Sequence, residues 1–200
     1  MKRLDRETQD LFRFHLVAYD GGSPPRSGSA DLTIVVLDAN DNSPVFDQTT
    51  YEVTIPEDVA PGTTVIRVRA EDLDIGQNGF IHYFLSPGTQ AQHGHSFSVG
   101  NYSGDVIVVG EVDYETYPSY TLVVNAVDLG PNPVSSETVV VVRVEDVNDN
   151  PPSIVINTLS ASRSTAAAVS EDAPVGTFLA HVVVSDPDSG HNGKSIRVQR

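Results

Sequence analysis

A five-residue acidic motif occurs twice in this chain, and the distance between its copies sets the size of the folding unit. Residues 38–42 read Asp-Ala-Asn-Asp-Asn and residues 146–150 read Asp-Val-Asn-Asp-Asn, a period of 108, with a proline within two residues after each copy. Four more motifs repeat nearly in step: Asp5-Arg6-Glu7 with Asp113-Tyr114-Glu115, Ala18-Tyr19-Asp20 with Ala126-Val127-Asp128, Glu57-Asp58 with Glu171-Asp172, and Asp72-Leu73-Asp74 with Asp186-Pro187-Asp188. A period of this size fits one domain of ordinary length.

The repeat predicts one whole domain flanked by two partial ones. The last two motif pairs are spaced by 114, so the third unit carries about six extra residues, which we place in the Ser/Ala-rich stretch 158–168. We therefore expect the C-terminal part of a domain at 1–37, a linker at 38–42, a complete domain at 43–145, a second linker at 146–150 and the N-terminal part of a third domain at 151–200.

Apolar and polar residues alternate with a period of two along most of the chain. This pattern is present at 14–18, 32–36, 51–55, 66–70 and 120–126, and Gly, Pro, Asn and Asp turns separate the runs. Helical periodicity is hard to find. The pattern is typical of half-buried strands joined by short turns, and it predicts an all-β fold of antiparallel strands in two sheets.

The charge balance favours cations as ligands. The chain has 27 acidic and 12 basic residues and a net charge of -15, which makes nucleic acid and anionic membranes poor partners. It has no cysteine, so no disulfide framework braces it. No run of eighteen apolar residues and no signal-peptide pattern is present, so membrane attachment is expected only through a transmembrane segment absent from this chain.

Many carboxylates are expected to meet at the first linker. The candidates are Asp5, Glu7, Asp41, Asp72, Asp74 and Asp128, with Asp38 and Asn40 nearby. Two such charges about 4 Å apart repel by roughly 4 kcal/mol at an effective dielectric of 20, so the junction needs a cation. Calcium takes about 6–8 oxygens from carboxylates, amides and carbonyls, whereas zinc prefers His or Cys and magnesium demands stricter geometry. Calcium is the predicted ion.

Catalysis is not expected. The chain has no G-x-S-x-G, G-x-G-x-x-G, P-loop or H-E-x-x-H motif. Paired carboxylates could serve a glycosidase, but here the acids gather at domain ends, which favours metal sites. A transition-metal site at His93-Gly94-His95 is a weaker interpretation than an exposed glycine-rich loop. We expect the chain not to be an enzyme.

The motif set resembles the cadherin superfamily over the whole chain. The cadherin pattern of a Glu near the first strand, DxD, DRE, AxD and a DxNDN linker is matched by Glu57, residues 72–74, 113–115, 126–128 and 146–150. The tyrosine at position 114 replaces the usual arginine and leaves both carboxylates intact. The resemblance implies tandem Greek-key β-sandwiches, with calcium ions held at each junction by the base of one domain, the linker and the top of the next.

The resemblance also implies a ligand set for each junction. For the first it gives Asp5, Glu7, the Ala39 carbonyl, Asn40, Asp41, the Asn42 carbonyl, Asp72, Asp74, the Asn78 carbonyl and Asp128. For the second it gives Glu57, Asp113, Glu115, the Val147 carbonyl, Asn148, Asp149, the Asn150 carbonyl, Asp186, Asp188 and the Asn192 carbonyl. Asp20 would belong to a further junction.

The resemblance implies calcium-dependent cell–cell adhesion or recognition by an extracellular, cell-surface array of repeats, and it leaves protocadherin and Dachsous/Fat types open. The implied partner is another cadherin-family ectodomain, in a homophilic or heterophilic pair. A purely structural calcium-stiffened spacer is the alternative. Asn101-Tyr102-Ser103 is an N-glycosylation sequon, so Asn101 is a candidate acceptor if the chain is secreted.

Overall fold

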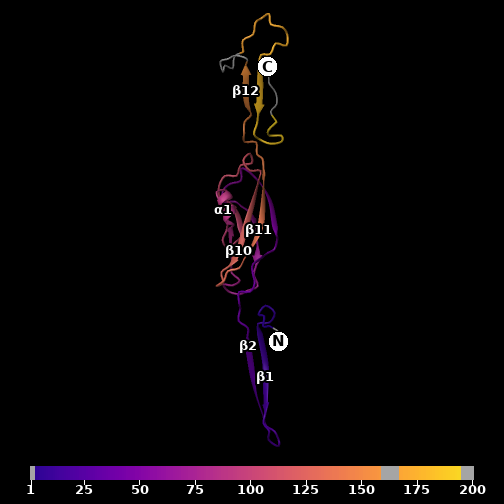
Figure 1. The fold of residues 1–200 in the computed structure, drawn as a ribbon, viewed down its shortest axis with the longest axis vertical. Helices are drawn as coiled ribbons and strands as arrows, with labels where there is room; N and C mark the ends of the chain where they lie inside the picture. The colour runs from indigo at the N-terminus through magenta and orange to yellow at the C-terminus, as the bar shows by residue number, and fades with distance from the viewer. Residues whose placement is uncertain (1–2, 159–166, 195–200) are drawn as a thin grey trace.

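The computed structural model describes residues 3–158 and 167–194, which form strands β1 to β13 and one short helix, α1. Their sheets follow one another along a single long axis, with the amino-terminal hairpin at one end and the carboxyl-terminal hairpin at the other (Figure 1). Most of the insertion predicted at 158–168 lies outside the described residues.

A two-stranded antiparallel hairpin stands at each end of the molecule. Strand β1 (Leu11–Tyr19) pairs with β2 (Ser27–Val35), and β12 (Ser153–Thr158) pairs with β13 (Ala180–Ser185). Nearly all side chains of these four strands are exposed or half-buried. The described residues of the two hairpins therefore bury no core of their own.

The central part is a sandwich with one buried core. Its strands are β3 (Val45–Phe46), β4 (Thr50–Pro56), β5 (Thr64–Arg67), β6 (Ala70–Glu71), β7 (Ile81–Leu85), β8 (Phe97–Val99), β9 (Asp105–Val108), β10 (Ser119–Asp128) and β11 (Ser135–Glu145). One sheet has the order β4-β11-β10-β7, another the order β5-β9-β8, and β3 pairs with β6. The predicted all-β class is confirmed.

The alternation read from the sequence becomes the inner face of the larger sheet. On β10 the side chains of Leu122 and Val124 are fully buried, and Val140 of the neighbouring β11 is buried beside them. Phe97 and Val106 of the opposite sheet are equally inaccessible. Burial of apolar surface contributes about 25 cal/mol per Å², so this shared layer is the main source of stability in the described residues.

Two strand predictions need correction. Strands β4 and β11 pair in parallel, from Thr50 beside Val139 to Pro56 beside Glu145, although we expected antiparallel pairs. Strands β4 and β11 run the same way because β4 leads the chain away from the first linker and β11 leads it towards the second. The strand predicted at 66–70 is also divided into β5 and β6, and between them the Val68 N–H donates to the Gly104 carbonyl at 2.9 Å.

Helix α1 (Pro87–His93) was missed, because seven residues are too few to show helical periodicity. The Ser86 hydroxyl caps it by accepting from the Thr89 N–H at 3.3 Å. The expectation of an exposed loop at 93–95 was wrong for His93, which is buried edge-on against Tyr117 and Tyr120, and this burial lowers its pKa. Among the described residues no helix is long and apolar enough to cross a membrane.

Candidate metal centres

Three carboxylates from separate segments converge at the first junction. One oxygen each from Glu7, Asp41 and Asp74 lies within 4.8 Å of the other two. Glu7 precedes β1, Asp41 belongs to the linker, and Asp74 lies in the loop after β6. The cluster therefore joins the amino-terminal hairpin, the linker and the central sandwich at one point.

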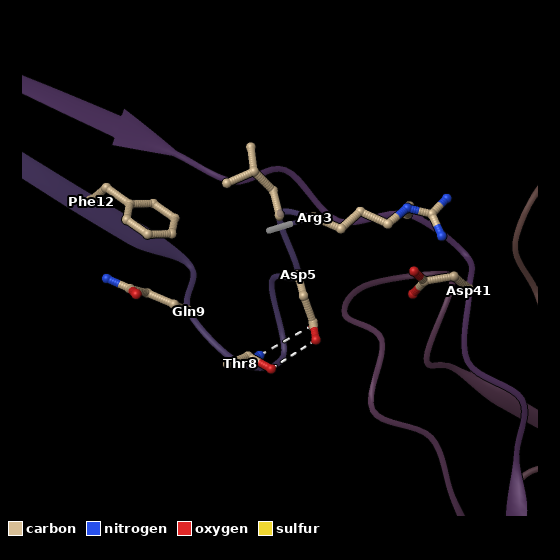
Figure 2. Close-up of a pocket in the computed structure, with 8 residues that line it drawn as sticks. Arg3, Asp5, Thr8, Gln9, Phe12 and Asp41 are labelled. Atoms are coloured by element: carbon tan, nitrogen blue, oxygen red, sulfur yellow. Dashed lines mark hydrogen bonds between the residues drawn. The ribbon is translucent and has the colours of Figure 1, made fainter. Parts of the chain in front are cut away.

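Asp5 and Asp113 occupy the same local turn at the two junctions. The Asp5 carboxylate accepts from the Thr8 hydroxyl at 2.7 Å and from its N–H at 3.3 Å. Asp113 accepts from Thr116 in the same two ways, at 2.7 and 3.2 Å. These hydrogen bonds lower the pKa of both carboxyls, so both stay ionised. Figure 2 shows the Asp5–Thr8 pair beside a surface cavity that Asp41 of the linker also lines.

The two DxD loops are folded alike. Asp72 accepts from the Asp74 N–H at 2.9 Å, and Asp186 accepts from the Asp188 N–H at 3.2 Å. Each loop then turns tightly onto a glycine: a Cβ at Gly79 would lie 2.0 Å from the Asp74 carbonyl oxygen. Gly193 is in the same position, with 1.9 Å to the Asp188 carbonyl oxygen. Only glycine permits this approach of backbone to backbone.

Linker asparagines fasten the linker to the following DxD loop. The Asn42 N–H and side-chain amide donate to the Asp74 carboxylate at 3.2 and 2.7 Å. At the second junction the Asn150 N–H donates to Asp188 at 3.2 Å. The side-chain amide of Asn150 donates instead to Asp149, at 2.7 Å. Both buried aspartates are thus held against the linker.

Asn40 joins the first linker to the end of β10. Its side-chain amide donates to Asp128 at 3.0 Å, and Asp128, which is 1% exposed, also accepts from the Gly130 and Val134 N–H groups at 2.8 and 2.7 Å. Asp20 has the same turn and accepts from the Gly22 and Arg26 N–H groups. Asp20 lies in the β1–β2 turn, at the far end of the hairpin from the first linker.

The second junction holds two overlapping carboxylate clusters. Glu57, Glu115 and Asp149 form one, and Glu115, Asp146 and Asp188 form the other. Glu57 is 7% exposed and accepts from the Tyr114 and Val147 N–H groups at 2.8 and 2.6 Å. Glu115 belongs to both clusters.

The crowding changes the acidity of this site. Burial, with the Glu57 and Asp149 charges, raises the pKa of Glu115 to about 7. Burial and the same Glu57 charge also raise the pKa of Asp149. At the first junction, burial and the charges of Asp74, Asp128 and Asp38 raise the pKa of Asp72. Each junction thus contains carboxylates whose charge is poorly compensated by the protein.

Unpaired buried oxygens test whether calcium fits these sites. Within the described residues, one oxygen each of Asp72, Asp188, Asp146 and the Asn40 amide is buried without a hydrogen-bond partner. Such orphaned acceptors are costly unless something else coordinates them. Carboxylate and amide oxygens are the hard donors that calcium takes, so the donor set fits that ion.

The first aspartate of each linker motif holds an asparagine of the following domain. In the sequence analysis Asp38 was placed only near the first junction, and Asp146 was given no role. Asp38 accepts from the Asn78 amide at 2.8 Å and contacts the Arg6 guanidinium at 2.5 Å. Asp146 accepts from the Asn192 amide at 2.8 Å. Although burial opposes it, the Asn78 and Arg6 contacts lower the pKa of Asp38. The signal was available, since this aspartate opens both copies of the motif.

Other predicted ligands are less constrained by their contacts. The Ala39 carbonyl accepts from the Asp41 N–H at 2.8 Å, and the Val147 N–H donates to Glu57 at 2.6 Å. Asn148 is exposed, unlike its counterpart Asn40. The use of the Ala39, Asn42, Asn78, Val147, Asn150 and Asn192 carbonyls as ligands stays a prediction.

Comparison with known proteins identifies the family. Residues 51–145 match the family model described as Cadherin domain. Human protocadherin-12 is 44% identical over 193 residues, 96% of this chain. The chain belongs to the cadherin superfamily. Within this superfamily the chain is similar in kind to protocadherins. It spans only 16% of the length of protocadherin-12.

Solved cadherin structures agree with this assignment. Extracellular domains 1–5 of protocadherin gamma B2 match 96% of this chain and 35% of their own, with 37% identity and a TM-score of 0.85. A protocadherin gamma B7 cis-dimer covering domains 3–6 matches 96% of this chain and 46% of its own, with 35% identity and a TM-score of 0.73. Cadherin-family adhesion proteins are not enzymes, so the expectation of a non-catalytic chain is confirmed.

Proposed function

We propose that this chain is part of an extracellular cadherin array in which calcium at the two junctions holds neighbouring β-sandwiches in line, in the service of calcium-dependent cell–cell adhesion or recognition. The observation that supports it most is the presence, at both junctions, of buried oxygens without a hydrogen-bond partner beside converging carboxylates. Bound calcium would coordinate these oxygens and neutralise the charge of the carboxylates around them. The division into domains at 1–37, 43–145 and 151–200, with linkers 38–42 and 146–150, is part of this proposal.

The chain's own residues would perform three tasks in that arrangement. Asp5 and Asp113 stay ionised through their threonine partners. Asn42 and Asn150 hold the linker against the next domain. Glu57 ties the base of the central sandwich to the second linker through the Val147 N–H. The proposed ligands are those given for each junction above, with Asp20 assigned to a further junction.

We also propose a cell-surface location and another cadherin-family ectodomain as partner. The likeness to a protocadherin solved as a cis-dimer supports a partner of this class. The proposed pair is homophilic or heterophilic. The net charge of -15 argues against nucleic acid and against direct contact with anionic membranes.

Small-angle scattering with calcium and with chelator tests the junction proposal. We expect chelation to change the profile, because the carboxylates of each junction then repel one another. Asp149→Ala should weaken calcium binding at the second junction, whereas Asp31→Ala, an exposed aspartate on the β2 strand, should not. A profile that does not respond to chelation would overturn the proposal.

Bead aggregation separates adhesion from the spacer alternative. Beads carrying the full parent ectodomain should cluster in calcium and disperse in chelator. Beads that never cluster, from a protein whose scattering still responds to calcium, would instead support a stiffened spacer without partner contact.

A further inference from the structure

Four aromatic rings stand in a row outside the core of the central sandwich. Phe80 and Tyr102 lie 5.5 Å apart between ring centroids, Tyr102 and His82 lie 5.6 Å apart, and His82 stacks on Phe84 at 5.7 Å. Three of the rings come from β7 and the residue before it, and Tyr102 comes from the β8–β9 loop. We call these four residues the ring ladder.

The ring ladder is not an extension of the core. Tyr83 and Leu85 alternate with its members on β7 and are each 6% exposed, so they take the inward positions. Phe80 and Tyr102 are 52% and 64% exposed. Isolated exposed apolar residues are common, but a contiguous group of aromatic rings marks a contact surface.

The backbone fixes the ring ladder next to the sequon. The Tyr83 N–H donates to the Asn101 carbonyl at 2.7 Å, which ties the β8–β9 loop to β7. Within the loop, the Gly100 N–H donates to the Asp105 carbonyl at 2.8 Å. Asn101 is exposed, and Tyr102, the middle residue of the sequon, is itself a member of the ring ladder. The backbone from which a group attached to Asn101 would start is therefore held against β7, one residue before Tyr102.

The chemistry of an N-linked sugar matches this surface. The face of an aromatic ring carries negative partial charge, and the C–H groups on one face of N-acetylglucosamine carry positive partial charge. Such C–H contacts are weak singly, but several can form at once over neighbouring rings. The sugar hydroxyls would then point away from the rings into water.

We propose that Asn101 carries an N-linked glycan whose first sugars pack on the ring ladder of Phe80, His82, Phe84 and Tyr102. In its attachment the Asn101 amide nitrogen forms a bond to the anomeric carbon of N-acetylglucosamine supplied by a lipid pyrophosphate donor. The bond from that carbon to the phosphate breaks, and the leaving phosphate takes the electron pair while the amide gives up a proton. The proposal needs secretion, as the proposed function does, but it does not need calcium.

The packed glycan would also cover the outward face of β7. Strand β7 is the last in the order β4-β11-β10-β7, and its outer edge is already contacted by the β8–β9 loop through the Tyr83 N–H. A bulky, solvated sugar over the rings would keep this face from a second copy, so recognition would use other surfaces of the sandwich.

The test uses this 200-residue chain secreted from mammalian cells behind a leader peptide, with ¹³C-labelled glycan. Mass spectrometry before and after enzymatic glycan removal should find Asn101 occupied. In NMR spectra the acetyl methyl of the first sugar should be shifted upfield by the rings and should tumble with the protein. Phe80→Ala and Tyr102→Ala should each move this signal towards its position in a free glycan, although both retain the sequon.

Tyr19→Ala provides the matched control, because Tyr19 is 74% exposed but lies at the end of β1, away from the ring ladder. It should leave the sugar signals unchanged. Phe80→Ala keeps the test valid if Tyr102→Ala reduces occupancy or folding. An unoccupied Asn101, or sugar signals that match a free glycan in the unsubstituted chain, would overturn the proposal.

A sedimentation measurement tests the alternative that a second copy of this chain, and not a glycan, covers the ring ladder. If Asn101→Gln protein dimerised through Tyr102 and the glycosylated chain had a freely tumbling sugar, the ring ladder would be a protein interface and the proposal would fail. Scattering in calcium and chelator reports on the junctions separately, so failure of the glycan proposal and failure of the proposed function remain distinguishable.

Discussion

The two junctions are built from the same repeated residues but differ in one side chain at their centre. At the first, the Arg6 guanidinium contacts Asp38 and Glu7 and donates to the Leu73 carbonyl at 2.5 Å. At the second, Tyr114 occupies the same motif position and packs against the hydrophobic core of the central sandwich. A positively charged side chain, Arg6, thus lies among the acids of the first junction. The described residues of the second junction have no basic side chain at the corresponding position.

This difference explains why Asp146 belongs to a carboxylate cluster of the described residues and Asp38 does not. The cluster with Glu57 has no counterpart to compare, because the sequence holds no residue at the corresponding position of the first junction. With Arg6 on Asp38, the first junction has a single cluster of Glu7, Asp41 and Asp74 among the described residues. Without an equivalent, Asp146 joins Glu115 and Asp188 in a second cluster. Arg6 also bridges the amino-terminal motif to the DxD loop of the central sandwich through Leu73. The second junction should therefore depend more strongly on calcium.

The largest effect is expected from Glu115→Ala. Glu115 belongs to both second-junction clusters, so its loss removes a carboxylate from each of them at once. Glu115→Ala should lower calcium affinity at the second junction by at least about tenfold, since even the loss of outer partners costs that much. Calorimetric titration of this variant beside Glu7→Ala and the exposed control Glu111→Ala checks the ranking. Equal losses for Glu115 and Glu111 would contradict it.

The second-largest effect is expected when Arg6 and Tyr114, the middle residues of the two corresponding motifs, are each replaced by the other residue type. Tyr114→Arg should place a guanidinium among the second-junction acids and reduce the response of the scattering profile to chelation. Arg6→Tyr should increase that response at the first junction. Both changes should be smaller than the effect of Glu115→Ala, because each exchange leaves the carboxylate ligands in place. The comparison between junctions breaks if both variants behave like the unsubstituted chain.

Acidity provides a third test. The pKa of Glu115 lies near 7, above its ordinary value, so the calcium-free folded chain holds a proton there that the unfolded chain releases. The contribution of Glu115 to stability without calcium should be fully present below the ordinary carboxyl pKa and should be lost as pH rises through about 7, which the difference in stability between the unsubstituted chain and Glu115→Gln measures. Calcium binding near pH 6.5 should release this proton, which titration in buffers of different ionisation heat measures. Glu115→Gln should abolish the release, and an unchanged release would exclude Glu115 as its source.

The smallest effect concerns Gly130, which is buried beside the first linker. A Cβ at this position would lie 2.7 Å from both the Asn40 amide nitrogen and the Asn78 amide oxygen. Gly130→Ala should displace these amides and weaken calcium binding at the first junction only, by a fewfold. Gly88→Ala is the matched control, because its Cβ would meet nothing within 4 Å. A loss at the second junction would argue against this local explanation.

Sequence periodicity predicted the parts of the fold that depend on local pattern. The buried alternation of β10 and the repeated acids of the linkers could be read directly, because a period of two and a period of 108 are properties of the sequence itself. Helix α1 was not predicted, because its seven residues are too few to show helical periodicity. The parallel pairing of β4 with β11 was not predicted either, because these strands lie far apart in the sequence. The contacts of Arg6 were equally hidden, since arginine next to two acids is usually a solvated surface charge.

The parallel pairing of β4 with β11 has a mechanical consequence. Strand β4 follows the first linker and the short strand β3, and the chain leaves the central sandwich just after β11. Thr50 to Pro56 lie alongside Val139 to Glu145. Tension applied between the two linkers would slide β4 and β11 past each other. The hydrogen bonds between these two strands would therefore share the load at once. A force that pulls along the chain would therefore meet resistance to shear, whereas a hairpin opened from one end yields one bond at a time.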